Sequence, residues 1–196
     1  YSGARGNIHL LGSGALTFDN CIISGNISTH KESAGAIHCA RKGVVTLNNC
    51  LLTGNTGGIA GAILMKKANL ATPEILRVTG GTVITGNTST TPRSYTYYAG
   101  GISCFNGTEL TIDSGAVYGN TIAGNTKSPD IYASKGVTVN LLAAKQMDAS
   151  HYDASMNNRY FAGSNYVWQN YNAKNVLVLI KESVEGSQSE ALRLEA

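Results

Sequence analysis

Cysteines and histidines are the residues of this chain with the most reactive side chains, and there are four of each. Cys21 and Cys50 stand at equivalent positions of two matching segments, as do His9 and His38. The cysteines form no Cys-x-x-Cys pair, so the sequence indicates no structural zinc site. A catalytic cysteine needs a nearby histidine, and the spacing indicates none. We expect free, buried thiols, a solvated histidine pair on a sheet face, no metal and no cofactor.

Acidic residues would carry the chemistry of an enzyme that cleaves polysaccharides, and here they are scattered along the chain. They include Asp19, Glu32, Glu74, Asp113 and Asp130. The one pair at equivalent repeat positions, Asp19 and Asp113, is separated by three repeats, which is too far for paired-carboxylate chemistry. We expect a non-catalytic protein. A polysaccharide lyase or glycoside hydrolase stays open as the alternative.

Residues 88–98 form the longest insertion between two repeated segments, and they concentrate aromatic and basic side chains. Arg93, Tyr95, Tyr97 and Tyr98 all lie in this stretch. Tyrosine and arginine are enriched among the residues that dominate binding energy, and tyrosine rings stack on sugar faces. Long insertions on a rigid scaffold often carry function. We therefore predict that these four residues contact a ligand; the alternative is a loop that packs against the scaffold.

Basic residues recur in the turn that follows a repeated Ala-Gly-x-Ile segment. They are Arg41, Lys42, Lys66, Lys67 and, one repeat later, Lys135. Stacked repeats would place them in a discontinuous positive stripe that suits an anionic glycan. The alternative is that turns simply accommodate charged side chains.

The elements that position these residues are short and repeated. Residues 8–26 match residues 37–55 without a gap, with eight of 19 positions identical. An apolar-x-Gly-Asn unit occurs at residues 23–26, 52–55, 84–87 and 117–120. The Ala-Gly-x-Ile unit occurs at residues 34–37, 60–63 and 99–102, with Ser-Pro-Asp-Ile at 128–131.

Three-residue segments that alternate apolar, polar, apolar lie between these two units. They are residues 16–18, 45–47, 76–78, 110–112 and 137–139. Such alternation is typical of strands with one buried face. A single repeat of this length cannot bury its own apolar face, so neighbouring repeats must stack on one another. We predict an all-β, right-handed parallel β-helix of about five coils over residues 1–144.

Stacking predicts columns of equivalent side chains. The Asn column contains Asn26, Asn55, Asn87 and Asn120, each bonded to the next coil, with the preceding Gly at positive φ. The core columns contain Ile37, Ile63, Ile102 and Ile131, and Cys39, Met65 and Cys104. An outward Thr column contains Thr17, Thr46, Thr111 and Thr138, and we interpret it as the ordinary wet face of a sheet.

The two repeated units resemble those of the polymorphic outer-membrane proteins, whose signatures are the tetrapeptides GGAI and FxxN. The combination is also similar to that of bacterial adhesin-type proteins on the pectate-lyase-like β-helix, and it covers roughly residues 5–144. Here Ala replaces the first Gly of GGAI, and Ile, Leu, Ile and Val replace the Phe of FxxN. The resemblance implies a surface-exposed, adhesive protein, and it carries over no catalytic residue.

Residues 145–186 lack the repeat and are predicted to cap the open end of the coils, with a hairpin of residues 166–171 and 176–181. Residues 187–196 are expected to be a tail or linker.

A net charge of +3 argues against nucleic acid as a partner, and no apolar run is long enough to insert into a membrane. The chain starts with Tyr1 in what looks like the middle of a repeat, so we expect a fragment of a larger protein. Taken together, the sequence predicts a bacterial adhesin-like binding module, secreted or at the cell surface, with a glycan or a host or surface protein as partner.

Overall fold

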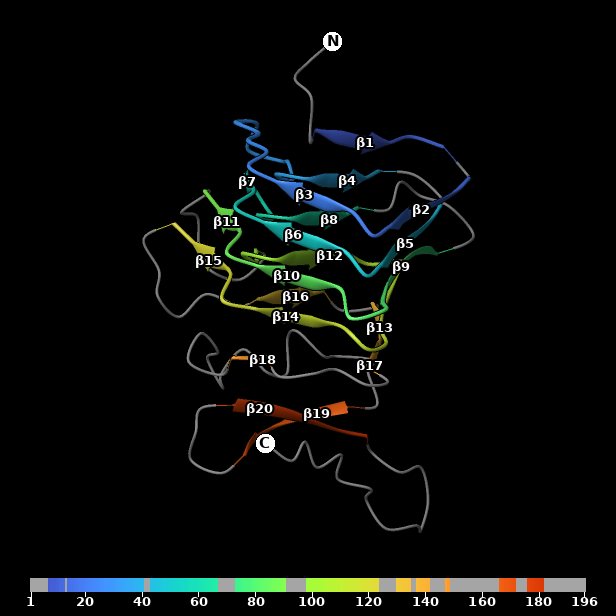
Figure 1. Ribbon diagram of the computed structural model, residues 1–196, viewed down its shortest axis with the longest axis vertical. Helices are drawn as coiled ribbons and strands as arrows, with labels where there is room; N and C mark the ends of the chain where they lie inside the picture. Colours follow the sequence, from blue (N-terminus) through green and yellow to red (C-terminus); the bar gives the residue numbers. More distant parts are fainter. Residues whose placement is uncertain are drawn as a thin grey trace.

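The computed structural model shows a parallel β-solenoid, with short strands stacked along the long axis of the molecule (Figure 1). The structure describes residues 7–12, 14–40, 43–66, 73–90, 98–123, 130–134, 137–141, 147–148, 166–171 and 176–181. Every regular element in this part of the chain is a strand. The predicted all-β solenoid is confirmed.

Four parallel sheets form the sides of the solenoid, and we name them A to D. Sheet A runs β1 (Ile8–Leu10), β4 (Ile37–Cys39), β8 (Ile63–Met65), β12 (Ile102–Cys104) and β16 (Ile131–Ala133). Sheet B runs β2 (Ala15–Asp19), β5 (Val44–Asn48), β9 (Glu74–Thr79), β13 (Thr108–Ile112) and β17 (Thr138–Leu141). Sheet C runs β3 (Ile22–Ser24), β6 (Leu51–Thr53), β10 (Val83–Thr85) and β14 (Ala116–Tyr118). Sheet D runs β7 (Thr56–Gly57), β11 (Thr88–Ser89) and β15 (Thr121–Ile122).

Three coils contribute a strand to all four sheets, whereas the sequence predicted about five coils in total. The first coil contributes β1, β2 and β3, and reaches sheet D only through an isolated bridge between Ile27 and Thr56. In the last coil the described strands are β16 and β17. Within the described residues, three full coils therefore lie between two that contribute fewer strands.

The core lies between the sheets and is built from the predicted columns. Ile37 pairs with Ile63, and Ile63 pairs with Ile102, in register along sheet A. All three side chains are fully buried, as are Met65 and Cys104 in the neighbouring column. Complete burial of one such aliphatic side chain contributes roughly 1.5–3 kcal/mol to folding. Stacking therefore supplies the apolar core that no single coil has.

A ladder of asparagine side chains lies at the corner between sheets C and D, and we call it the Asn ladder. The side-chain Nδ2 of Asn26, Asn55 and Asn87 each donates to the Oδ1 of the Asn in the next coil at 2.8 Å. The same Oδ1 atoms also accept the backbone N–H of the preceding Asn at 3.0–3.1 Å. The predicted column is confirmed. Each rung of the Asn ladder links two coils through two hydrogen bonds.

Asn55, Asn87 and Asn120 also tie their own coils to the coil before, through the carbonyls of Ile23, Leu52 and Ile84. The Nδ2 of Asn87 donates to the carbonyl of Leu52 at 3.0 Å and to that of Thr85 at 3.0 Å. The Gly that precedes each Asn has a φ of 63–66°, as predicted, so the chain can turn sharply there. The buried amide is thus fully used, as a buried polar group must be.

The Asn ladder ends at an aspartate. Asp130 Oδ1 accepts the side-chain N–H of Asn120 at 2.8 Å and its backbone N–H at 2.7 Å. An Asp side chain has no N–H to pass on, so it accepts from the ladder and does not extend it as an amide would. The Asn ladder therefore has a direction, from the first coil toward the last, and Asp130 terminates it.

The Gly of the Ala-Gly-x-Ile unit is required by close backbone packing. A Cβ added to Gly61 would lie 2.1 Å from the carbonyl oxygen of Gly100 and 2.4 Å from the backbone N of Thr88. Gly35 and Gly100 have equally close neighbours. This repeated signature is therefore explained by a lack of space between adjacent coils, and any larger residue would push them apart.

Two predictions about the outer faces are wrong. His9 and His38 do stack, with ring centroids 4.8 Å apart, but His38 is fully buried instead of solvated, because further chain covers sheet A. Thr138 pairs with Glu109, and it is Asn140 that pairs with Thr111, so Thr138 lies outside the Thr column. A slip of two residues keeps the same side chains facing inward, so alternation alone cannot reveal it.

A small antiparallel sheet follows the solenoid. It contains β18 (Met147–Asp148), β19 (Tyr166–Tyr171) and β20 (Val176–Lys181), with β20 in the middle. Figure 1 shows it at the C-terminal end of the stack. Residues 187–196 lie outside the described part of the chain.

Replacing Asn87 by Asp should destabilise the protein by about 3 kcal/mol, because both side-chain N–H groups, which lie near three acceptors, are lost and a carboxylate then faces carbonyl groups. Urea unfolding followed by circular dichroism measures this. The control is Asn26→Asp at the half-buried first rung, where water can replace the lost partners and the cost should be about 1 kcal/mol. Equal destabilisation by the two substitutions would contradict the argument that burial makes the interior rungs more important for stability.

Gly61→Ala should destabilise the protein by about 2–3 kcal/mol, because the new methyl group overlaps backbone atoms that cannot rotate away. Gly14→Ala is the matched control, since a Cβ there has no atom within 4 Å. The control should unfold within about 0.5 kcal/mol of the parent protein. Thermal unfolding of both variants compares them, and a neutral Gly61→Ala would refute the packing argument.

Candidate ligand-binding face

A second layer of chain covers the outer side of sheet A, and we call this second layer the outer layer. Its apolar centre consists of Ala34, Ile59, Ala60 and Leu64, with Tyr98 and Phe105 packed against it. Isolated bridges join Ala34 to Ala60 and Ala60 to Ala99, so the layer continues from coil to coil. Sheet A is thereby buried on both faces, which is why all residues of β4, β8 and β12 are buried.

The insertion at residues 88–98 is attached to the solenoid at both ends. At its start, Thr88 and Ser89 form β11, so these two residues belong to a strand and not to a loop. The next residue, Thr90, donates its backbone N–H to Gly57 O at 2.7 Å and its hydroxyl to the same oxygen at 3.1 Å. Just beyond its end, Ala99 donates to Ser103 Oγ at 3.1 Å. Residues 91–97, outside the described part of the chain, connect these two fixed points.

Tyr98 packs as part of the outer layer. Its side chain is half-buried against the Ala34, Ile59, Ala60 and Leu64 cluster. Tyr98 was predicted to contact a ligand. Its packing against the outer layer is the role that the alternative prediction, a loop packed on the scaffold, gave it. Arg93, Tyr95 and Tyr97 lie outside the described residues.

Lys66 is the described member of the predicted basic group. Its Nζ lies 3.2 Å from Glu32 Oε2, and both side chains are about 40% exposed, at 40% and 42%. An exposed pair of this kind contributes at most about 1 kcal/mol, so the ammonium can exchange its partner at small cost. Arg41, Lys42 and Lys67 lie outside the described residues. The partner Glu32 was missed, because it stands 34 positions away in another coil.

Lys66 and Tyr98 border the same face from opposite ends of sheet A. Lys66 directly follows β8, and Tyr98 stands a few residues before β12, which pairs with β8. A strand of three residues spans about 10 Å, which is the scale of a few sugar rings. The two groups of residues that the sequence singled out are thus brought to two edges of one face, the outer layer.

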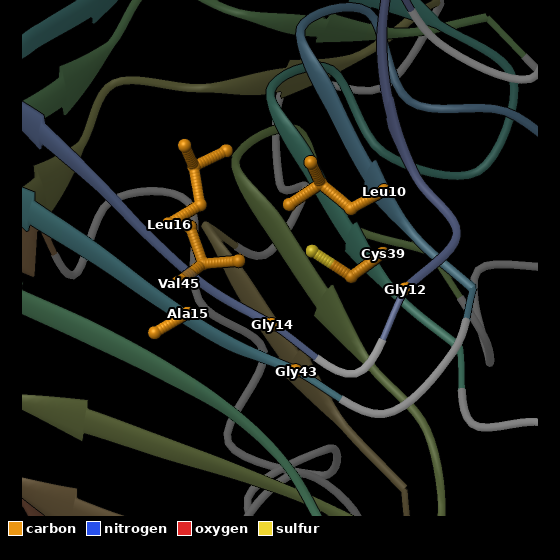
Figure 2. A pocket seen from close by; sticks show the side chains of 8 residues that line it. All are labelled: Leu10, Gly12, Gly14, Ala15, Leu16, Cys39, Gly43 and Val45. Carbon is orange, nitrogen blue, oxygen red and sulfur yellow. The ribbon is translucent and has the colours of Figure 1, made fainter.

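A pocket of about 220 Å³ opens at the first coil, at the turn between sheets A and B (Figure 2). Leu10 and Cys39 line it from sheet A, and Leu16 and Val45 from sheet B. Gly12, Gly14, Ala15 and Gly43 complete the lining. No lining side chain is charged, and the only reactive group is the Cys39 thiol. The pocket is apolar and offers nothing to orient a polar substrate.

The cysteine thiols are free, as predicted. Burial raises the pKa of Cys39 and Cys50, and raises that of Cys104 to about 12, with the Glu74 carboxylate adding to the effect at Cys39 and Cys104. A thiol is nucleophilic only as thiolate, so these groups are inert near neutral pH. Cys21 differs from the prediction in being only partly buried.

Glu74 is fully buried in the core, which the sequence analysis missed. The signal was available: Glu74 is in phase with the inward residues Leu76 and Val78 of β9. The described residues contain no group of three or more His, Cys, Asp or Glu that could hold a metal ion. Within the same part of the chain no helix is long and apolar enough to cross a membrane.

Comparison with known proteins gives no match: no family model, curated protein or solved structure is significantly similar to this chain.

An Ellman titration of the folded protein at pH 8 should show one fast thiol, Cys21, and three that react only after unfolding. Cys21→Ser is the control and should remove the fast phase. A second fast phase in that variant would contradict the burial of the other three thiols.

The raised pKa values also predict how stability depends on pH. An unfolded thiol titrates near 8.5, whereas the buried thiols stay protonated well above that value. The unfolded state then binds fewer protons than the folded state, so the thiol contribution is complete below about pH 8.5 and falls as the pH rises toward 12. Cys104→Ala should flatten this fall in urea midpoints between pH 8 and 10.5.

Proposed function

We propose that this chain is a non-catalytic binding module of a bacterial adhesin-like protein, secreted or displayed at the cell surface. Its ligand is a glycan or a protein on a host or other surface. It meets this ligand with the outer layer on sheet A. The resemblance to polymorphic outer-membrane and pectate-lyase-like adhesin repeats is part of this proposal.

The observation that carries the proposal is the attachment of residues 88–98 at both ends. Hydrogen bonds from Thr90 hold one end, and the packing of Tyr98 and the bond from Ala99 hold the other. The seven residues between these two attachment points include Arg93, Tyr95 and Tyr97. A preorganised support lowers the entropy that a loop loses when it binds.

The positive charge of Lys66, at the edge of the outer layer opposite Tyr98, is a second argument for this face as the binding site. Lys66 is partly exposed and is held by one weak ion pair. An anionic ligand could replace Glu32 as its partner at little cost. Arg41, Lys42 and Lys67 follow the same strand ends in the sequence and would extend this positive edge.

A glycan array and surface-protein binding assay should detect a ligand, and the combined variant Arg93→Ala, Tyr95→Ala, Tyr97→Ala should weaken binding at least ~10-fold. Its melting temperature should stay that of the parent protein. Tyr118→Ala is the matched control, since Tyr118 is an exposed tyrosine on sheet C, and it should bind normally. Unchanged binding by the combined variant would remove residues 91–97 as the site.

Tyr98 needs separate treatment because of its packing. Tyr98→Ala should lower the melting temperature, whereas Tyr98→Phe should keep it. The enzyme alternative is tested on the same ligands, by ultraviolet absorbance for unsaturated sugars and by a reducing-end assay. Steady product release that a single acidic or basic substitution abolishes would overturn the binding-module proposal.

A further inference from the structure

The first coil leaves inward apolar side chains only partly buried, whereas the second coil buries their partners. Ile8 and Leu10 are partly buried, and Ile37 and Cys39, which pair with them, are buried. In the core, Phe18 is partly buried, whereas Leu47, its partner in the second coil, is fully buried. The strands β1, β2 and β3 each form the edge of their sheet. The surface that coils use to contact one another is therefore open at this end.

The apolar pocket opens at this same end. Its volume of about 220 Å³ lies between Leu10 and Leu16 of the first coil and Cys39 and Val45 of the second. Figure 2 shows these side chains converging from the two sheets on one space. Its lining is that of the core, so the opening continues the coil–coil interface.

The direction of the Asn ladder indicates which hydrogen-bonding group a neighbouring coil must bring to this end. Within the ladder, the Oδ1 of Asn55, Asn87 and Asn120 each accepts two N–H groups from the coil before it. Asn26 donates to Asn55 in this way, but no described residue donates to Asn26 Oδ1. At the first rung, therefore, Asn26 Oδ1 is an acceptor to which no described residue donates.

We propose that the N-terminal end of the solenoid is the docking surface for one further β-solenoid coil, running in line into β1. This coil brings inward apolar residues and a ladder Asn that donates its side-chain and backbone N–H to Asn26 Oδ1. The proposal is independent of the ligand-binding function and concerns a different surface.

The ladder also argues against a second copy of this chain as the occupant. Two copies placed head to head would set one Asn26 acceptor against another. Head to tail, Asn26 Oδ1 would meet the end that Asp130 closes, where the carboxylate offers no donor. Only a coil with its own donor amide matches this end.

The test adds a coil to the whole chain. Ile8 pairs with Ile37, so a copy of residues 8–36 inserted before Ile8 is one coil in register. The added coil should raise the melting temperature by about 5 °C or more. Amide hydrogen exchange of Ile22, Ile23 and Ser24 should slow at least ~10-fold as water loses access to this end.

Two controls separate the ladder from added length. The same insert with Asp in place of Asn at the copied ladder position has no side-chain N–H to donate to Asn26 Oδ1 and should give a clearly smaller rise. A Gly/Ser insert of equal length cannot stack and should give no rise. A copy of residues 37–62, which also ends in register because Ile37 pairs with Ile63, is a second version of the coil. If neither copy folds or neither raises stability, the proposal is wrong.

Equal stabilisation by the Asn and Asp inserts would also overturn it, because the ladder would then play no part. Sedimentation of the unextended chain provides the remaining test, and we expect a monomer. A dimer that Ile22→Lys disperses would show that a second copy covers this end, and would overturn the in-line coil.

Discussion

The directional Asn ladder is the interaction on which the rest of this solenoid depends. Each amide occupies a corner where the strands have ended, and supplies partners to backbone groups that no sheet can reach. Its partners lie 29, 32 and 33 residues apart, so coil length varies while the ladder stays in register. Extra residues must therefore leave the stack at its surface. The insertions that carry the predicted binding residues are a direct result.

Close packing of glycine fixes the second layer in the same manner. Because Gly35, Gly61 and Gly100 have no side chain, the outer layer can lie directly on neighbouring backbone. Sheet A is then buried on both faces, and the layer becomes a firm support instead of a set of loose turns. This places Tyr98 and Lys66 at two edges of one face, where a ligand could contact both.

The reactive groups of the described chain lie mostly in its interior. Cys39, Cys104 and Glu74 share the core, where burial keeps the thiols protonated. The thiols of Cys39 and Cys104 are therefore poor nucleophiles near neutral pH. On the outer surface of the described residues lie threonine and tyrosine side chains and the Lys66–Glu32 ion pair.

The all-β solenoid, the Asn ladder and the inward columns could be predicted from the sequence, because the same pattern of residues recurs in each coil and equivalent residues stack. The sequence could not determine features that depend on contacts between non-equivalent residues. The register that places Thr138 opposite Glu109, the burial of His38 and the Lys66–Glu32 pair are features of this kind. Asp130 is the clearest case: in the repeat it occupies the place of Ala or Gly, yet its carboxylate terminates the Asn ladder. Only the tertiary structure could decide this, since the side-chain N–H of Asn120 donates to the oxygen that the folded chain brings within 2.8 Å.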